Sequence, residues 1–271
     1  MESKLQLRVQ RYGWDAAAAI YEQEWAQNLA PAQEAMLAAS DLRPGNDVIE
    51  TAAGTGLVTF AAARAVAPDG QILATDLSGE MVERGAAQAQ RLGLDNVTFQ
   101  RMNSEALESE EDRFDRALCC LGLMYMPNPV VALSEMKRVL KPGARVSVAV
   151  WGERRRCGWA ELFPIVDARV HSEVCPLFFG LGASGALSSD MEAAGFSRIE
   201  EQRLDLSLVF DGEERALAAL IDGGAVALAT KRFDAATRQA VDQELLASIA
   251  DYREGDRFTI PGEFVIASAF A

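Results

Sequence analysis

The stretch Val48–Thr59 carries the residue types whose chemistry is easiest to interpret. A short apolar run ends in the acid Glu50, and small residues with two glycines, Gly54 and Gly56, precede an alanine-rich segment. The pattern predicts a buried parallel strand, a tight loop and a helix from Thr55 onward. Glycine lets the backbone approach a ligand closely, and a helix N-terminus presents unpaired N–H groups. We therefore expect this turn to bind a small molecule.

Two kinds of ligand suit such a turn. A dinucleotide site has the pattern G-x-G-x-x-G, in which the third glycine lets the helix pack close to the strand. Thr59 occupies that third position, so the dinucleotide pattern is incomplete. Glu50 lies four residues before Gly54, where a carboxylate would repel a pyrophosphate. The same carboxylate would favour a ligand that carries an ammonium and a sulfonium.

Asp76 is a second acid at the end of a predicted strand, and it follows Gly56 by 20 residues. A carboxylate there can accept two hydrogen bonds from the vicinal hydroxyls of a ribose. The alternative is that Asp76 only caps the helix predicted to begin near Ser78. Enzymes that use NAD have the same acid, so it indicates a nucleoside without choosing the cofactor. Met81 would lie against an adenine or be an ordinary core residue.

Further strands and helices alternate after this point. Strands are predicted over 97–100, 114–120 and 144–151, and helices over 78–92 and 130–140. In open α/β sheets ligands bind beyond the carboxyl ends of the strands, where the strand order reverses. This rule places Cys120, Leu121 and Tyr125 at the reaction centre.

Several motifs resemble one family. The first stretch resembles the first motif of class I S-adenosylmethionine-dependent methyltransferases, hydrophobic-hydrophobic-Asp/Glu-x-x-x-Gly-x-Gly. The run Ala132–Val146, which includes Lys141-Pro142-Gly143, is similar to the family's sequence before and within its fifth strand. Val148–Gly152 resembles the branch of quinone-biosynthesis and secondary-metabolite (type 11-like) methyltransferases. The resemblance is strong over about residues 40–152 and looser beyond them.

The resemblance implies S-adenosyl-L-methionine as the cofactor. Glu50 and the loop 52–56 would hold its methionine part, and Asp76 would hold its ribose. Asn103 stands where the family usually has Asp, and its side-chain oxygen can still accept a hydrogen bond from the adenine. The full set of cofactor-binding residues that we expect is Glu50, Ala52, Ala53, Gly54, Thr55, Gly56, Asp76, Leu77, Met81, Asn103, Ser104, Cys120 and Leu121.

We expect an α/β fold with a seven-stranded, mostly parallel, doubly wound Rossmann-like sheet and a helical lid. The last strand, 264–270, would be antiparallel because it arrives from a loop without a crossover helix. The expected organisation is a helical cover (1–40), a cofactor-binding core (41–152), a lid insertion (153–186) and the remainder of the core (187–271). A helical excursion is expected over 211–255.

Composition limits the classes of partner. The 271 residues carry 40 acids and 26 bases, a formal charge of −14 with a pI near 4.6, which disfavours nucleic-acid binding. No secretory leader pattern and no transmembrane span appear in the sequence, so we expect a soluble cytoplasmic protein. Four cysteines without C-x-x-C spacing and a single histidine predict free thiols and no metal site.

The expected reaction moves a methyl group to an O, C or N atom of a small aromatic or polyketide-like acceptor. Apolar and aromatic residues dominate the predicted lid, and Trp14 and Tyr21 are expected as pocket walls. A neutral acceptor needs a base, for which the candidates are His171, Tyr125 and Tyr21. The run 154–156, three arginines, would be a solvated face or attract an anionic substrate.

Two other functions stay open at this point. The chain would alternatively be a non-catalytic S-adenosylmethionine-binding or assembly partner protein, and next in order an NAD(P)-dependent oxidoreductase. Thr59 and Glu50 disfavour the oxidoreductase. The sequence also leaves a homodimer open.

Overall fold

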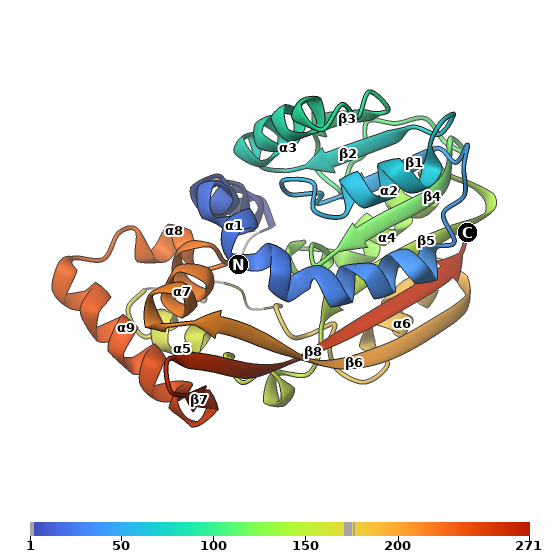
Figure 1. Cartoon of the computed structure of the whole chain (residues 1–271). Helices are drawn as coiled ribbons and strands as arrows, with labels where there is room; N and C mark the ends of the chain where they lie inside the picture. Colours follow the sequence, from blue (N-terminus) through green and yellow to red (C-terminus); the bar gives the residue numbers. More distant parts are fainter. Residues whose placement is uncertain (1–2, 171–174, 176) are drawn as a thin grey trace.

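The computed structural model describes residues 3–170, 175 and 177–271 (Figure 1). Within them the strands form one sheet in the order β3-β2-β1-β4-β5-β8-β6, and a short strand, β7, pairs with β8. The first five strands are parallel to one another. Their bounds are β1 Val48–Thr51, β2 Ile72–Asp76, β3 Val97–Arg101, β4 Phe114–Cys120 and β5 Leu140–Trp151. The strand order reverses between β1 and β4, which is where a doubly wound sheet binds ligands.

The sheet is covered on both faces, because its central strands are apolar on both sides. Val48, Ile72 and Leu118 pack with helix α2 and with Met36 in one core cluster. Ile49, Leu73 and Ala117, one position along, point to the other face and pack with helices α4 and α6. The helices of these layers are α2 Thr59–Val66, α3 Gly79–Arg91, α4 Pro129–Val139 and α6 Ala186–Ala193.

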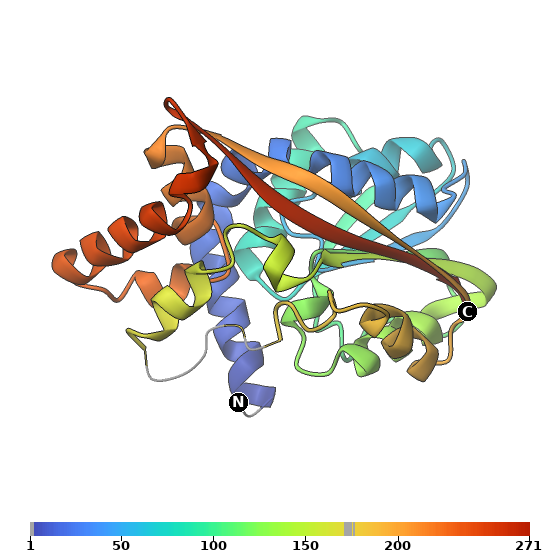
Figure 2. The same cartoon turned by 90° about the horizontal axis from the view of Figure 1, so that it is seen from below.

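The carboxyl half of the chain adds a long antiparallel pair. Strand β8, Arg257–Phe270, lies between β5 and β6, Ser197–Asp211, and is antiparallel to both. The pair extends past the end of β5, and helices gather around the extension (Figures 1 and 2). They are α5 Leu162–Asp167, α7 Glu213–Leu217, a π-helical turn Ala218–Asp222, α8 Ala227–Thr230 and α9 Ala235–Ser248, with β7 Arg253–Glu254 following. The mostly parallel Rossmann-like sheet with an antiparallel last strand is therefore confirmed.

Three predicted boundaries differ from the structure. Helix α2 begins at Thr59 rather than Thr55, because the loop before it uses left-handed backbone at Gly54 and Gly56. Strand β5 begins at Leu140 and takes in the following Lys-Pro-Gly turn. Strand β8 begins at Arg257 rather than Phe264. Pairing with β5 starts at Phe264. Before it, the first two residues of β8 pair with both β6 and β7, and the following residues, which include Pro261, pair with β6 alone. Proline is tolerated in a strand at such an edge.

Helix α1, Ser3–Ser40, joins the two halves of the molecule. Its first part crosses the carboxyl ends of the strands, and its second part runs along the sheet (Figures 1 and 2). Pro31, which has no N–H to donate, lies inside it. Ser78 at the start of α3 donates a hydrogen bond of 2.6 Å to Asp15, which ties α1 to the second strand–helix unit.

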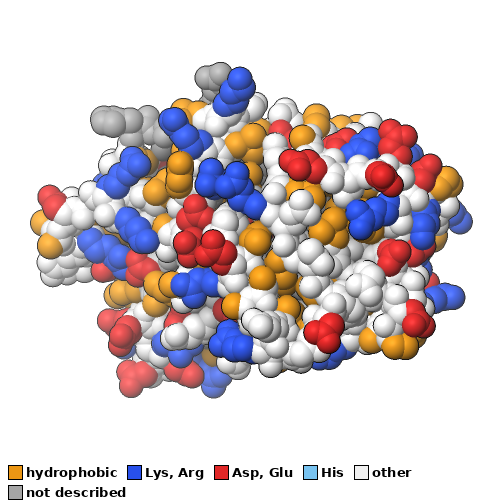
Figure 3. Space-filling view, turned by 90° about the horizontal axis from the view of Figure 1, so that it is seen from above, with side chains coloured by type: hydrophobic (Ala, Val, Ile, Leu, Met, Phe, Trp, Pro, Cys, Tyr) orange, Lys and Arg blue, Asp and Glu red, His pale blue; other side chains and the backbone are white. Residues whose placement is uncertain are grey.

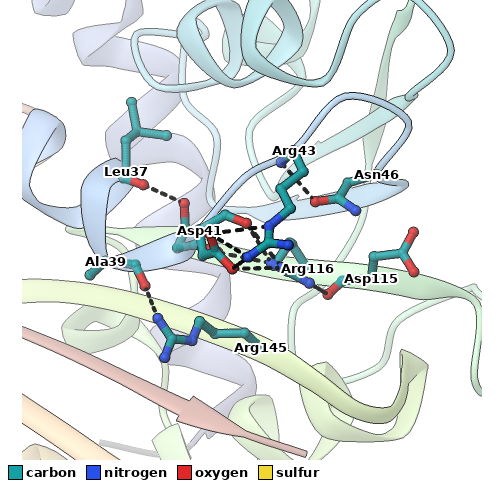
Figure 4. A network of polar contacts seen from close by, with 9 residues as sticks. Leu37, Ala39, Asp41, Arg43, Asn46, Asp115, Arg116 and Arg145 are labelled. Carbon is teal, nitrogen blue, oxygen red and sulfur yellow. Dashed lines mark hydrogen bonds and ion pairs between the residues drawn. The ribbon is translucent and has the colours of Figure 1, made fainter.

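Arginines from the sheet hold the carboxyl end of α1 (Figure 4). Arg116 of β4 donates to the Ser40 carbonyl at 2.8 Å, and Arg145 of β5 donates to the Ala39 carbonyl at 2.8 Å. The last carbonyls of a helix have no partners within it and carry a partial negative charge, so guanidinium groups stabilise them. Asp41, with φ of 48°, turns the chain out of the helix.

Segment 153–186 contains little regular structure in its described part. Its three arginines form the 3-10 turn Arg154–Arg156, and each is paired with an acid. Arg156 lies 2.9 Å from the buried Glu263, so the run is a neutralised surface. None of the helices in the described ranges is long and apolar enough to cross a membrane.

Candidate functional site

A first cavity of about 660 Å³ lies between α1 and the carboxyl ends of β1, β2 and β4. Its wall brings together residues from five separate parts of the sequence. Those expected to bind a cofactor are Ala52, Gly54, Asp76, Leu77, Met81, Asn103, Ser104, Cys120 and Leu121, and Trp14, Tyr21 and Tyr125 join them. The wall also contains residues that sequence reasoning missed, namely Leu7, Gln10, Gly122 and Met126.

The loop after β1 approaches the cavity with unusual backbone. Ala52 has φ of 53° and Gly54 has φ of 57°, and Leu121 on the neighbouring strand end has φ of 57°. Left-handed backbone at residues other than glycine is strained, and such strain is concentrated at ligand sites. A Cβ on Gly122 would lie 2.2 Å from the Cβ of Ala52, so glycine is needed for these two strand ends to meet.

Asp76 is held at the cavity by the backbone. Its Oδ2 accepts the N–H of Gly54 at 2.8 Å, and its Oδ1 accepts the N–H of Ser78 at 2.8 Å. Burial raises the pKa of Asp76 to about 6, although both hydrogen bonds act to lower it. Each carboxylate oxygen has a further lone pair, so both can still accept a hydroxyl. The N-cap residue of helix α3 is Ser78, whose hydroxyl accepts a hydrogen bond from the N–H of Met81. Asp76 is therefore not the N-cap of this helix.

Glu50 is buried behind the loop rather than in the cavity wall. Its side chain is 1 % exposed, and its Oε2 accepts a hydrogen bond of 2.6 Å from the hydroxyl of Thr59. Burial raises the pKa of Glu50 to about 8, with a smaller contribution from the charge of Asp76. Thr59, which stands in place of a third glycine, is thus the partner of this carboxyl group. Ala53, Thr55 and Gly56 likewise do not line the described wall.

Asn103 and Met81 form the far end of the first cavity. The side-chain oxygen of Asn103 accepts the N–H of Glu105 at 3.1 Å, which leaves one lone pair and the NH₂ group for other partners. Met81 is 2 % exposed and lies beside Leu77 in the wall. The wall therefore carries both the amide of Asn103 and the apolar side chain of Met81.

A second cavity of about 440 Å³ adjoins the first and shares Trp14, Tyr21, Leu121 and Tyr125 with it. The remaining wall is almost wholly apolar and aromatic. None of the described residues that line it carries a charge. Trp14 stands at the junction, with its ring 5.7 Å from Tyr21 and 5.1 Å from Tyr125. The other aromatic residues of the wall are Trp25, Trp151, Trp159, Phe163 and Phe178.

The second cavity was only partly foreseeable. An aromatic lid segment predicted the contribution of Trp159 and Phe178, whereas Trp25 and Trp151 belong to α1 and to the end of β5. In the first cavity, one face of α1 contributes Leu7, Gln10, Trp14 and Tyr21 at helical spacing. This periodicity was the sequence signal that could have predicted Leu7 and Gln10, which were missed.

Two of the three candidate bases, Tyr21 and Tyr125, lie among the described residues. Burial raises the pKa of Tyr21 and of Tyr125 well above the usual value, so both phenols stay protonated near neutral pH. Neither hydroxyl makes a hydrogen bond with another described residue. His171 lies outside the described residues, and its role as a base stays a prediction.

The buried thiols of the described chain are poor metal ligands. Burial raises the pKa of the Cys119 thiol to about 11 and that of Cys120 well above its usual value, so neither is a thiolate near neutral pH. No group of three or more metal-binding side chains occurs in the part of the chain that the structure describes.

Comparison with known proteins finds similar sequences for the segment that contains much of this site. Residues 48–143 match the family model described as a methyltransferase domain. The ubiquinone/menaquinone biosynthesis C-methyltransferase of Marinomonas sp. is 37 % identical over 110 residues, 40 % of this chain and 44 % of that protein. The nocamycin O-methyltransferase of Saccharothrix syringae is 25 % identical over 264 residues, 91 % of this chain and 92 % of that protein.

Solved structures share the fold. The phosphoethanolamine N-methyltransferase 2 of Haemonchus contortus, in complex with S-adenosyl-L-methionine, superposes with a TM-score of 0.63 at 16 % identity. The match covers 94 % of this chain and 57 % of that one. The chain spans less than half the length of the first curated relatives that it matches, 43 % in one case. The matched domain, the sheet order and the motif residues gathered at one edge make the chain similar to class I S-adenosylmethionine-dependent methyltransferases.

Proposed function

We propose that this protein transfers the methyl group of S-adenosyl-L-methionine to a small aromatic or polyketide-like acceptor. The observation that carries the proposal is the meeting of two unlike cavities. One is lined by Asp76, Asn103 and the glycine loop, and the other by aromatic rings, and they join at Tyr21 and Tyr125. A nucleoside cofactor fits the first and an apolar acceptor fits the second.

The residues of the first cavity fit the cofactor by their chemistry. Asp76 would accept the two ribose hydroxyls through its free lone pairs, and Asn103 would face the adenine. The N–H and carbonyl groups of the 52–56 loop would bind the polar end, with Glu50 as the nearby negative charge behind it. The bound cofactor supplies an electrophilic methyl group on a sulfonium.

The chain's own contribution to the rate would be alignment and exclusion of water. In-line displacement asks little covalent work of a protein, so positioning in a dry pocket supplies most of the acceleration. The N-terminal cover (1–40) and the lid (153–186) would close the two cavities. The phenols of Tyr21 and Tyr125 would donate hydrogen bonds to the acceptor at the junction, because they remain protonated.

The names of two relatives support a small acceptor without identifying it. One is a ubiquinone/menaquinone biosynthesis C-methyltransferase and the other a nocamycin O-methyltransferase. The acceptor atom, whether O, C or N, is to be found by a screen of phenols, quinols, enols and amines with a homocysteine readout. Turnover on protein or RNA alone would refute a small-molecule acceptor.

Cofactor binding is tested by calorimetry on the Asp76→Asn variant. Loss of a hydrogen bond from a charged group, about 1.5–3 kcal/mol, predicts S-adenosylmethionine affinity lower by roughly tenfold or more. Asp115→Asn is a matched control, because Asp115 also accepts a backbone N–H, from Asp47, at the opposite end of the sheet. Equal affinity in Asp76→Asn and wild type would contradict the placement of the ribose.

A further inference from the structure

Two tryptophans of the second cavity differ in their hydrogen bonding. The indole N–H of Trp25 donates to the carbonyl of Ala219 at 3.1 Å. The indole N–H of Trp159 is buried and makes no hydrogen bond with any other described residue. Trp159 is 3 % exposed, and its ring is enclosed by Trp151 at 4.9 Å and Phe178 at 5.5 Å. These neighbours offer no oxygen to it.

A buried donor without a partner is costly and rare in proteins, so each one needs an explanation. Trp159 follows directly after the turn that leaves β5, and a backbone hydrogen bond from Gly158 to Pro261 at 2.9 Å fixes the start of its segment. Its position in the cavity wall is therefore set by the fold. An oxygen of a ligand in the cavity that Trp159 lines would supply the missing hydrogen-bond acceptor.

We propose that the indole N–H of Trp159 is the hydrogen-bond donor that recognises a carbonyl oxygen on the ring system of the methyl acceptor. The inference rests on the proposed function, because it assigns the second cavity to the acceptor. The wall carries no charged side chain, so the acceptor part that lies there is uncharged. The aromatic walls of the cavity suit a flat ring system with one or two fused rings. The substrate class is thus an aryl ketone or a quinone-like ring.

The first experiment follows the indole signals by NMR. The chain has four tryptophans, and the spectrum of Trp159→Phe assigns the signal of Trp159 by its absence. The probes are 1-tetralone and tetralin, which differ by the carbonyl oxygen. We expect 1-tetralone to move the Trp159 indole proton downfield, tetralin to lack this shift, and the bonded Trp25 signal to change little with either. An indole N–H that points at a neighbouring ring instead would give no such difference between the probes and would overturn the proposal.

The second experiment measures probe affinity by calorimetry. A neutral hydrogen bond predicts that 1-tetralone binds wild type about three- to tenfold more tightly than tetralin. This ratio should fall to about one in Trp159→Phe and persist in Trp25→Phe, whose indole already has a partner. Because both probes report on the same variant, the ratio is insensitive to the lost ring volume.

The outcomes separate the two proposals. Neither measurement requires cofactor or turnover, so a failed activity screen leaves the indole result interpretable. A ratio unchanged in Trp159→Phe, or no binding of 1-tetralone to wild type, would overturn the role of Trp159 even if methyl transfer is found.

Discussion

Burial holds two carboxyl groups beside the first cavity closer to neutrality than they would be in water. The pKa of Glu50 is raised to about 8 and that of Asp76 to about 6, in both cases mainly by desolvation. A cationic ligand would reverse this effect, because a nearby positive charge favours the ionised carboxylate. At the scale of single residues, the site thus has a charge that depends on occupancy.

The Glu50→Gln variant tests the raised pKa of Glu50. In the unfolded chain Glu50 ionises near pH 4.5, whereas in the folded chain it keeps its proton up to about pH 8. The free energy of unfolding therefore falls as pH rises through this window, and the loss is complete above pH 8. Most of the change from Asp76 occurs below pH 6, so between pH 6 and pH 8 the titration of Glu50 dominates and lowers the free energy of unfolding by about 2 kcal/mol. Denaturant unfolding of both proteins at the two pH values measures it.

In Glu50→Gln the glutamine oxygen keeps the hydrogen bond from Thr59, so the substitution removes the titration and little else. We expect the stability of the variant to be nearly level over this range. Parallel curves for variant and wild type would show that Glu50 does not titrate near neutral pH.

Helix α3 shows how an element places site residues through close packing. It follows Asp76 directly and carries Met81, so its distance from the sheet determines the width of the first cavity. Gly85 in its middle faces Phe99 of β3, and a Cβ there would lie 2.3 Å from the Phe99 ring. The glycine is required by packing, even though glycine weakens a helix.

The Gly85→Ala variant is therefore expected to lose stability. Overpacking costs about 1–3 kcal/mol, and the gain in helix propensity returns about 1 kcal/mol, so we expect a net loss of up to about 2 kcal/mol. Gly79→Ala in the same helix is the matched control, because nothing lies within 4 Å of its added Cβ. Thermal unfolding compares the two, and a Gly85→Ala protein as stable as Gly79→Ala would contradict the packing argument.

At the scale of the whole molecule, the formal charge is strongly negative. The chain has a net charge of −14, and acidic and basic side chains are interspersed on the face shown in Figure 3. Ligand selection is accordingly a matter of the enclosed cavities. Helix α1 closes both cavities from one side, through Trp14 and Tyr21, so cofactor binding should stabilise the entire fold.

The melting temperature tests this coupling. At a concentration of 100 times its Kd, S-adenosylmethionine should stabilise the folded state by about 2.7 kcal/mol, which raises Tm by roughly 5–10 °C for a chain of this size. NAD at the same concentration should leave Tm unchanged. A shift with NAD and none with S-adenosylmethionine would contradict the cofactor assignment.

The sequence alone determined the sheet class and the first cavity's polar residues. Local patterns predict the bounds of β4 and the strands that precede the glycine loop and end at Asp76, and the carboxyl-end rule then brings Gly54, Asp76 and Leu121 to one edge. The sheet class depends on short-range periodicity, and the polar residues of the first cavity depend on a motif whose spacing is set by the backbone.

Only the tertiary structure decided where side chains face and which distant segments meet. The burial of Glu50 and its hydrogen bond from Thr59 at the start of α2 could not be read from the sequence motif. The aromatic cavity joins Trp25, Trp151 and Trp159 from three segments, and which indole keeps an unpaired N–H depends on their packing. No local pattern encodes such long-range contacts, because they arise from the way the segments pack on the sheet.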